Sequence, residues 1–171
     1  MRKVLFYGAI SLDGYLADKQ DNLDWLLNSD LQGKSTYEDF ISHVDTLVMG
    51  HNTYQETKKI LDGEPFYPEQ KIFVFSHSQA SLDDATVVKG DVAKFINQQK
   101  ELAGQDLWIV GGGPIVQPLI EADLIDEWQI QIAPFLLGNG KRLFEPGDYF
   151  KKLKLVNTTN LGELTELHFK K

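Results

Sequence analysis

The sequence predicts an α/β protein with three layers, in which helices cover both faces of a mixed, mostly parallel sheet that ends in an antiparallel C-terminal hairpin. Short apolar runs alternate along the chain with segments whose apolar residues recur at helical spacing. The first run is apolar at nearly every position, which is typical of strands buried on both faces. Two final segments, over about 152–159 and 163–169, flank a Leu161-Gly162 turn. We expect one domain over residues 1–171, with a sheet of about 7 or 8 strands.

The first half of the chain contains two predicted strands, each followed later by a helix. Ser35 and Glu38 have the spacing of a capping box, which places a helix start there. Asn52 is predicted to cap the second helix through its side-chain oxygen. The strands are expected at residues 3–10 and 46–50, and the helices at 35–44 and roughly 53–61.

The second half continues the alternation. Asp91 is an expected helix start, and the alternating residues 127–132 predict a strand that is buried on one face. Further strands are expected at 71–75, 86–88 and 107–110.

The stretch 107–120 joins a buried strand, a turn of three glycines and an amphipathic helix. Pro114 suits the helix start because the missing N–H of a proline would have been unpaired there. Glycines permit a close approach to the backbone, and the helix start offers free N–H groups and the positive end of the helix dipole. These features fit an anion such as pyrophosphate, and an ordinary structural turn accounts for them equally well.

Three turns with small or donor-rich residues follow predicted parallel strands. The carboxyl ends of such strands meet at one edge of the sheet, where ligands of α/β proteins bind. One extended phosphorylated ligand could therefore lie across all three turns. They are Gly50-His51-Asn52-Thr53, Ser76-His77-Ser78 and Gly111-Gly112-Gly113.

Composition excludes several classes of protein. The 17 basic and 25 acidic side chains give a formal charge of −8, which disfavours nucleic acid or an anionic membrane as the main partner. The absence of cysteine leaves no disulfide framework and no thiolate metal site. The four histidines have no metal-ligand spacing, so no metal is expected. The short apolar run near the N-terminus predicts a strand rather than a signal peptide, and we expect a cytoplasmic protein.

Four motifs carry a family resemblance. They are Ile10-Ser11-Leu12-Asp13-Gly14-Tyr15-Leu16-Ala17, Val48-Met49-Gly50-His51-Asn52-Thr53-Tyr54, Val110-Gly111-Gly112-Gly113 and Pro134-Phe135-Leu136-Leu137-Gly138-Asn139-Gly140-Lys141-Arg142-Leu143-Phe144. Together they resemble the reductase domain of bifunctional riboflavin-biosynthesis proteins and its stand-alone bacterial relatives, which share the dihydrofolate reductase fold. The last motif is the most diagnostic, because the others also fit dihydrofolate reductases. The resemblance covers nearly the whole chain.

The resemblance implies NADPH-dependent hydride transfer, as in a 5-amino-6-(5-phosphoribosylamino)uracil reductase. It also implies a cis peptide bond within the glycine turn, here Gly111-Gly112. The implied NADPH-binding residues are Ala9, Leu16 and Ala17 at the nicotinamide; Gly50, His51, Asn52, Thr53, Val110, Gly111, Gly112, Gly113, Pro114 and Ile115 around the phosphates; and Phe75, Ser76 and His77 at the adenosine.

The chain departs from the family pattern in ways that bear on ligands. His51 stands where relatives usually place arginine or lysine against the 2′-phosphate, and an imidazole is only partly charged at neutral pH. The preference for NADPH over NADH is therefore weakened. Gln70 lies where dihydrofolate reductases keep a folate-binding arginine, so we do not expect folate to be the substrate. The sequence lacks the spaced His and Cys ligands of a zinc-binding deaminase domain, so we expect no deaminase chemistry from it.

Hydride transfer to a small heterocyclic substrate needs a proton donor and a surface for a flat ring. Asp13 and Glu38 are the candidate acids; their alternative roles are to cap the loop beside Gly14 and to complete the capping box. Trp25, Tyr37 and Phe40 are candidate substrate contacts, and such aromatic residues equally suit the core.

Two other functions fit the same residues: a catalytically silent nucleotide-binding module, and an oxidoreductase of other carbonyl or imine compounds. A homodimer is expected from base rates, and the alternating strand around Trp128 is one possible dimer surface.

Overall fold

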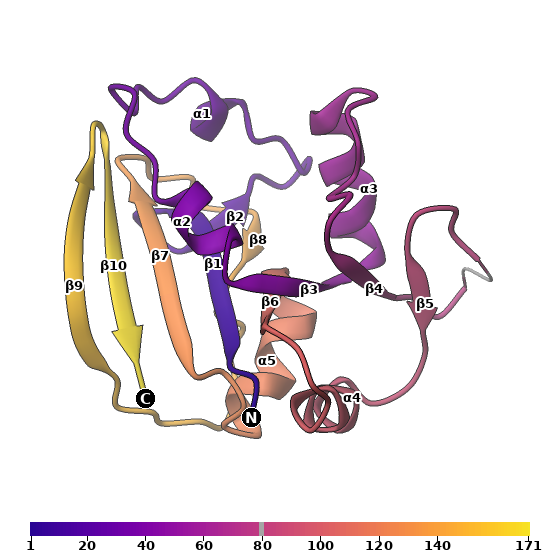
Figure 1. Ribbon diagram of the computed structural model, residues 1–171. Coiled ribbons are helices and arrows are strands. Elements are labelled where there is room, and N and C mark those ends of the chain that lie inside the picture. Colours follow the sequence, from indigo (N-terminus) through magenta and orange to yellow (C-terminus); the bar gives the residue numbers. More distant parts are fainter. Residues whose placement is uncertain (79–80) are drawn as a thin grey trace.

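The computed structural model describes residues 1–78 and 81–171, and its centre is one large sheet. The strands of this sheet are β1 (Val4–Ser11), β3 (Val44–Gly50), β4 (Lys71–Phe75), β5 (Thr86–Val88), β6 (Asp106–Gly111), β7 (Glu127–Ala133), β9 (Lys154–Leu161) and β10 (Leu164–Lys170). Their order is β5-β4-β3-β6-β1-β7-β10-β9 (Figure 1). All neighbours are parallel except the pairs β7–β10 and β10–β9, which are antiparallel. This arrangement confirms the predicted fold class.

Helices cover both faces of the sheet. They are α1 (Asp24–Leu27), α2 (Tyr37–Ile41), α3 (His51–Leu61), α4 (Val92–Lys100) and α5 (Gly113–Glu121). One core contains buried residues of α4 and α5, and the other contains those of α2 and α3. On β1, Val4 and Phe6 belong to the first core whereas Leu5 and Tyr7 belong to the second, because successive side chains of a strand point to opposite faces. The expectation that the first strand is buried on both faces is confirmed.

Two predicted helix starts are wrong. The helix expected over 35–44 is only α2, because β3 already begins at Val44. The Ser35 hydroxyl accepts a hydrogen bond from the amide of Tyr37, 3.1 Å away, and no capping box forms. Helix α3 begins at His51, one residue after β3 ends, so Asn52 lies inside the helix and does not cap it. The helix start expected at Asp91 is confirmed, since Asp91 is the N-cap of α4 and its carboxylate accepts from the amide of Lys94.

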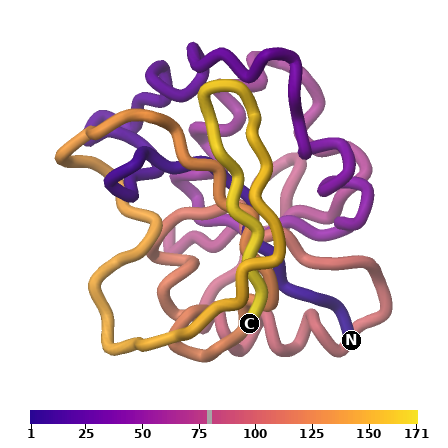
Figure 2. Tube along the Cα trace, turned by 90° about the vertical axis from the view of Figure 1, so that its left-hand side faces the viewer, coloured from indigo at the N-terminus to yellow at the C-terminus, as the bar shows by residue number. Residues whose placement is uncertain are grey.

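The C-terminal hairpin lies along one side of the molecule (Figure 2). Its turn is Gly162-Glu163, and Gly162 has φ 71°, a left-handed conformation that favours glycine. A Cβ atom there would lie 2.3 Å from the carbonyl oxygen of Asp30, so the segment before α2 packs closely against the turn. Strand β9 forms the outer edge, since β10 is its partner in the sheet.

The suggested dimer surface around Trp128 is wrong. Strand β7 lies inside the sheet between β1 and β10. The Trp128 side chain is 4% exposed, and its ring lies 5.4 Å from that of Phe6 and 5.6 Å from that of Phe144. It is a core residue.

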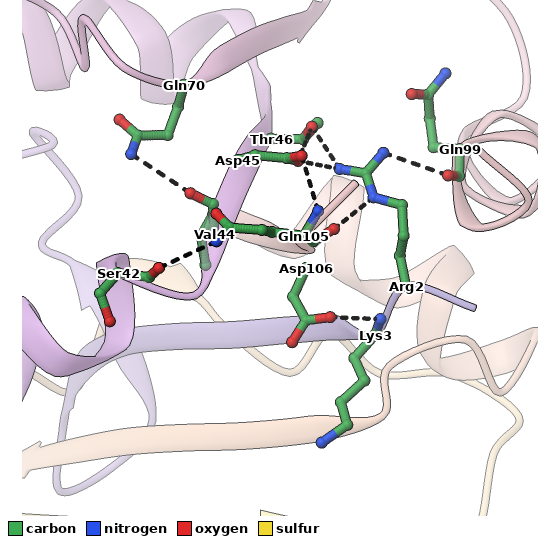
Figure 3. A network of polar contacts seen from close by, with 10 residues as sticks. All are labelled: Arg2, Lys3, Ser42, Val44, Asp45, Thr46, Gln70, Gln99, Gln105 and Asp106. Atoms are coloured by element: carbon green, nitrogen blue, oxygen red, sulfur yellow. Dashed lines mark hydrogen bonds and ion pairs between the residues drawn. The ribbon is translucent and has the colours of Figure 1, made fainter. Parts of the chain in front are cut away.

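A polar network ties together the amino ends of the strands (Figure 3). Arg2 is buried, and its guanidinium donates to Thr46 Oγ1 at 2.6 Å, to the carbonyl oxygen of Gln105 at 2.5 Å and to the carboxylate of Asp45. The Gln105 amide also donates to Asp45. The network therefore joins the chain before β1 to β3 and to the segment that enters β6.

None of the helices among the described residues combines the length and the apolar character needed to span a membrane.

Candidate active site

A cavity of about 750 Å³ opens at the carboxyl ends of β3, β4 and β6. The three turns that the sequence predicted to converge all line it. All of the predicted cofactor-binding residues line the cavity: Ala9, Leu16, Ala17, Gly50, His51, Asn52, Thr53, Phe75, Ser76, His77, Val110, Gly111, Gly112, Gly113, Pro114 and Ile115. Residues far apart in the sequence thus meet at one edge of one sheet.

The glycine turn forms one wall of the cavity. The Gly111-Gly112 peptide bond is cis, as the resemblance implies. Gly112 is the N-cap of α5 and offers no side chain to its free amides. A Cβ atom on Gly113 would lie 2.7 Å from the carbonyl oxygen of Arg142, so this residue must be glycine for the turn to pack. A Cβ atom on Gly112 would meet Leu16 only at 3.7 Å, in ordinary contact.

The start of α3 forms the facing wall. Gly50 is its N-cap, with no side-chain hydrogen bond to the first amides of the helix. His51, Asn52 and Thr53 in the first turn line the cavity. Two helix N-termini, each with the positive end of its helix dipole, therefore border the same space. Such a space favours an anionic group between them.

The end of the cavity near β4 and β5 holds imidazole, ammonium and hydroxyl groups. His51, His77 and Lys89 line it together with Ser76. Within the described residues, His51 Nδ1 is the one buried side-chain nitrogen or oxygen atom that lacks a hydrogen-bond partner. A buried polar atom of this kind is costly unless a ligand or water satisfies it.

The opposite end of the cavity is apolar. It is lined by Gly8, Ala9 and Leu16. Leu23, just before α1, and Leu26, within α1, line it as well. Leu26 also packs in the same apolar cluster as Ala9. A flat ring placed here would contact mainly aliphatic groups.

The candidate acid Asp13 fastens a loop. Its carboxylate accepts hydrogen bonds from the Ser11 hydroxyl at 2.6 Å and from the amides of Gly138 at 2.7 Å and Leu137 at 3.1 Å. The Ser11 hydrogen bond, helped by the two amides, lowers the pKa of Asp13 to about 2. The group is ionised at neutral pH and lies outside the residues that line the cavity. Its surroundings fit the alternative role as a loop cap.

The other candidate acid, Glu38, lies on the exposed side of α2, outside the residues that line the cavity. Phe40 of the same helix is 4% exposed, and its ring stacks on Tyr7 at 4.4 Å, so it is a core residue and its predicted substrate contact is wrong. Tyr37 is half-buried against Trp108, and burial raises its pKa. Trp25 packs against Phe135 and donates from Nε1 to the carbonyl oxygen of Asn22 at 3.1 Å.

Several residues outside the predicted cofactor-binding set also line the cavity. Lys141 and Arg142 form β8 (Lys141–Arg142), which pairs with β2 (Tyr15–Ala17) beside the cavity. Their place in the diagnostic fourth motif was the available signal. Further lining residues outside that set include Asp21, Leu23, Leu26, Glu56, Thr57, Ile60, Lys89 and Glu145. The described residues contain no group of three or more His, Asp or Glu side chains arranged to hold a metal ion.

The strand order and the cavity define a protein with the dihydrofolate reductase-like fold. A dihydrofolate reductase from Enterococcus faecalis, solved with NADP(H), has the same fold, with a TM-score of 0.70 and 15% identity over 98% of this chain and 95% of that one. The chain belongs to the RibD C-terminal domain family, whose family model matches residues 2–167.

Two relatives match the chain over nearly its whole length. The uncharacterised protein YwjB of Bacillus subtilis (strain 168) is 34% identical over 170 residues, which cover 98% of this chain and 97% of YwjB. A protein of Shewanella sp. PV-4, provisionally assigned to riboflavin biosynthesis, has a crystal structure with a TM-score of 0.83 and 30% identity, and the match covers 99% of this chain and 98% of that one. These comparisons place the chain in a reductase-like family.

Proposed function

We propose that this chain is an NADPH-dependent reductase that transfers a hydride to a small pyrimidine-like or pterin-like heterocycle. The observation that carries the proposal is the pair of helix N-termini, of α3 and α5, that border one cavity together with the glycine turn. A dinucleotide needs an anion site in its middle and different surroundings at its two ends, and this cavity offers both. Membership of the RibD C-terminal domain family supports the same activity.

The residues of the cavity fit the parts of NADPH. The amides at the starts of α3 and α5 would hold the pyrophosphate, and the absence of a side chain at Gly112 leaves room for it. The unpartnered Nδ1 of His51 would face the adenosine end, beside Ser76 and Lys89. When bound, the reduced nicotinamide would supply the hydride. Ala9 and Leu16 would hold its ring and exclude water from it.

A methyl group at Gly112 gives a sharp test of the proposed cofactor site. In the Gly112→Ala variant the added Cβ makes only ordinary contacts, at 3.7 Å to Leu16 and 3.9 Å to Thr53, yet it occupies the space for the pyrophosphate. We expect unchanged thermal stability and at least about tenfold weaker NADPH binding, measured by fluorescence titration. Gly113→Ala is the matched comparison, because its Cβ would lie 2.7 Å from a backbone oxygen and should destabilise the fold itself.

A wild-type dissociation constant for NADPH weaker than about 1 mM would remove the proposal. Equal NADPH affinity in wild type and Gly112→Ala would refute the assignment of the pyrophosphate to this turn.

A silent binding module of the same fold remains a second candidate, because Asp13 is fastened to the loop and ionised. Oxidation of NADPH in the presence of a panel of pyrimidines, pterins, carbonyl compounds and imines separates the possibilities. The silent module predicts NADPH binding with no turnover of any member, and the reductase predicts turnover of a heterocycle.

A further inference from the structure

A second cavity lies on the α5 side of the sheet, apart from the candidate active site. It has a volume of about 300 Å³, and its walls come from the end of α5, the start of β7 and the irregular segment 143–153 between β8 and β9. In Figure 2 this segment forms a wide arc at the lower left. No described residue lines both cavities, so the second is a separate space. We call it the α5 pocket, and its walls include Leu119, Ile120, Ile125, Trp128, Phe144 and Tyr149.

The inner walls of the α5 pocket are apolar. Leu119 and Ile120 of α5 and Trp128 of β7 are each at most 7% exposed. The ring of Trp128 lies 5.6 Å from that of Phe144, and the two planes meet at 46°, so the rings form a corner. An apolar cavity of about 150 Å³ in another protein binds one benzene molecule. The α5 pocket has about twice that volume, which gives room for two fused aromatic rings.

Phe150 lies at the mouth of the α5 pocket with nearly all of its surface in water. It lines the pocket and is 96% exposed. A phenylalanine in this position contributes almost no apolar burial to the fold, because the hydrophobic effect depends on the area removed from water. A flat apolar ligand in the pocket would cover part of this side chain. The exposed ring therefore suits an aromatic ligand.

Two lysines add positive charge to the lining of the α5 pocket. The ammonium groups of Lys151 and Lys171 lie 3.7 and 3.9 Å from the carboxylate of Asp123, and both distances are longer than a hydrogen bond. Lys171 is held by other groups, since its Nζ lies 3.1 Å from the Asp126 carboxylate and donates to the carbonyl oxygen of Asp123 at 2.8 Å. Asp123 is the one ion-pair partner of Lys151 among the described residues. The Lys151 ammonium can therefore donate to an anionic ligand.

Further lysines lie next to these two in the chain or across the hairpin. They are Lys152, Lys154 and Lys170, and none of them forms an ion pair within residues 1–78 and 81–171. Lys154 stands directly opposite Lys170 in the pairing of β9 with β10, and like charges opposite each other destabilise a sheet. In a chain with a formal charge of −8, this local surplus of positive charge favours an anion near the mouth of the pocket.

We propose that the α5 pocket binds a small aromatic carboxylate, whose rings pack on Trp128 and Phe150 and whose carboxylate accepts hydrogen bonds from Lys151. The proposal is independent of the proposed reductase function, because the pocket shares no lining residue with the candidate active site. A charged oxygen gains more from an ammonium donor than a neutral oxygen does. A sugar or a nucleotide is rejected, since its polar groups would lose their hydrogen bonds with water against the apolar walls.

Three naphthalenes that share their rings and differ in charge test the proposal. They are 2-naphthoate, 2-naphthamide and 2-naphthylmethylamine, which is a cation at neutral pH. Each is titrated into the full chain, without cofactor, by calorimetry. We expect 2-naphthoate to bind with a dissociation constant below about 1 mM and at least about tenfold more tightly than the other two. The indole N–H signals of the three tryptophans in ¹⁵N NMR report the place: Trp128 should respond, whereas Trp25 and Trp108 should not.

Substitution of Lys151 tests the charge. Lys151→Met should reduce the ratio of 2-naphthoate affinity to 2-naphthamide affinity to less than about threefold. Lys152→Met is the matched control, because it removes the same charge from the adjacent residue, which does not line the pocket. It should keep the ratio within about twofold of wild type.

Substitution of Phe150 tests the aromatic contact. Phe150→Ala should weaken the binding of all three compounds by about fivefold or more. Leu136→Ala is its control, because Leu136 is 75% exposed and lines neither cavity. All four variants change exposed residues, so their melting temperatures should stay as in wild type.

A dissociation constant for 2-naphthoate weaker than about 1 mM, equal affinities for the three compounds, or an unchanged ratio in Lys151→Met overturns the proposal. Saturating NADPH should leave the affinity for 2-naphthoate unchanged. Competition between the two, or a response of Trp25 in place of Trp128, would place the compound in the candidate active site and overturn its assignment to the α5 pocket.

Discussion

Replacing Arg2 by methionine removes the guanidinium from the network at the amino ends of the strands while keeping the length of the side chain. The change deletes the hydrogen bonds to Thr46, Gln105 and Asp45. Breaking a buried ion pair costs about 3–5 kcal/mol. The Asp45 side chain is 31% exposed and keeps the donors of Thr46 and Gln105, which lowers this cost. We therefore expect a loss of about 3 kcal/mol in the free energy of unfolding.

The neighbouring residue provides the control. Lys3 also forms an ion pair, with Glu127, but its side chain is 58% exposed. Lys3→Met should therefore cost only about 0.5 kcal/mol. Both variants are measured by urea denaturation followed by tryptophan fluorescence and circular dichroism. Equal losses in the two variants, or a loss under about 1 kcal/mol for Arg2→Met, would refute the argument from burial.

The same network predicts a pH dependence. Partial burial opposes ionisation of Asp45, but hydrogen bonds from Thr46 and Gln105 and the charge of Arg2 together lower its pKa. Because the native state then binds the proton less readily than the unfolded chain, Asp45 stabilises the fold above about pH 4, and this stabilisation is lost as the pH falls. In Arg2→Met the free energy of unfolding should therefore fall less on acidification than it does in wild type.

Three further predictions concern the site and assembly. His51→Arg should raise the ratio of NADPH affinity to NADH affinity by about tenfold, because arginine binds phosphate with a permanent charge. An unchanged ratio in fluorescence titrations would place the 2′-phosphate elsewhere. Asp13→Asn should lower the melting temperature at pH 7 but have little effect near pH 2, where the wild-type carboxyl, with a pKa of about 2, is itself partly protonated; equal shifts at both values would contradict this. We also propose a homodimer through the exposed edge strand β9, which carries Leu155 and Val156; a monomer mass in light scattering at micromolar concentration would exclude it.

The parts of the fold that local signals determine could be predicted. Strands β4 and β5 have the predicted bounds, because each is a short apolar run between turn residues. The Asp91 cap was predictable because its partner is three residues away. The three cavity turns were predictable because strand ends in a parallel sheet share one edge.

Features set by distant partners were not predictable. The segment before α2 was misread because Ser35 and Glu38 imitate a capping box, whereas the N-cap residue Thr36 binds Glu166, 130 positions away. The pattern around Trp128 alternates, but the sequence alone does not show that β10 pairs with the edge of β7 that would otherwise be free. Glu166 is 2% exposed and accepts a hydrogen bond from Gln131 on the neighbouring strand β7, whereas its place on an alternating strand indicates an exposed residue.

The Arg2 network and the cavity lie at opposite ends of the same strands, since β3 contributes Asp45 and Thr46 at its start and Gly50 at its finish. A strand of this length separates its ends by about 20 Å, which exceeds the distance over which charges interact strongly in salt solution. Effects of substitutions at the two ends should therefore add without coupling. Substitutions at the cavity can thus change ligand preference, and substitutions at the opposite edge can independently restore thermal stability. This separation makes the chain a practical starting point for directed evolution.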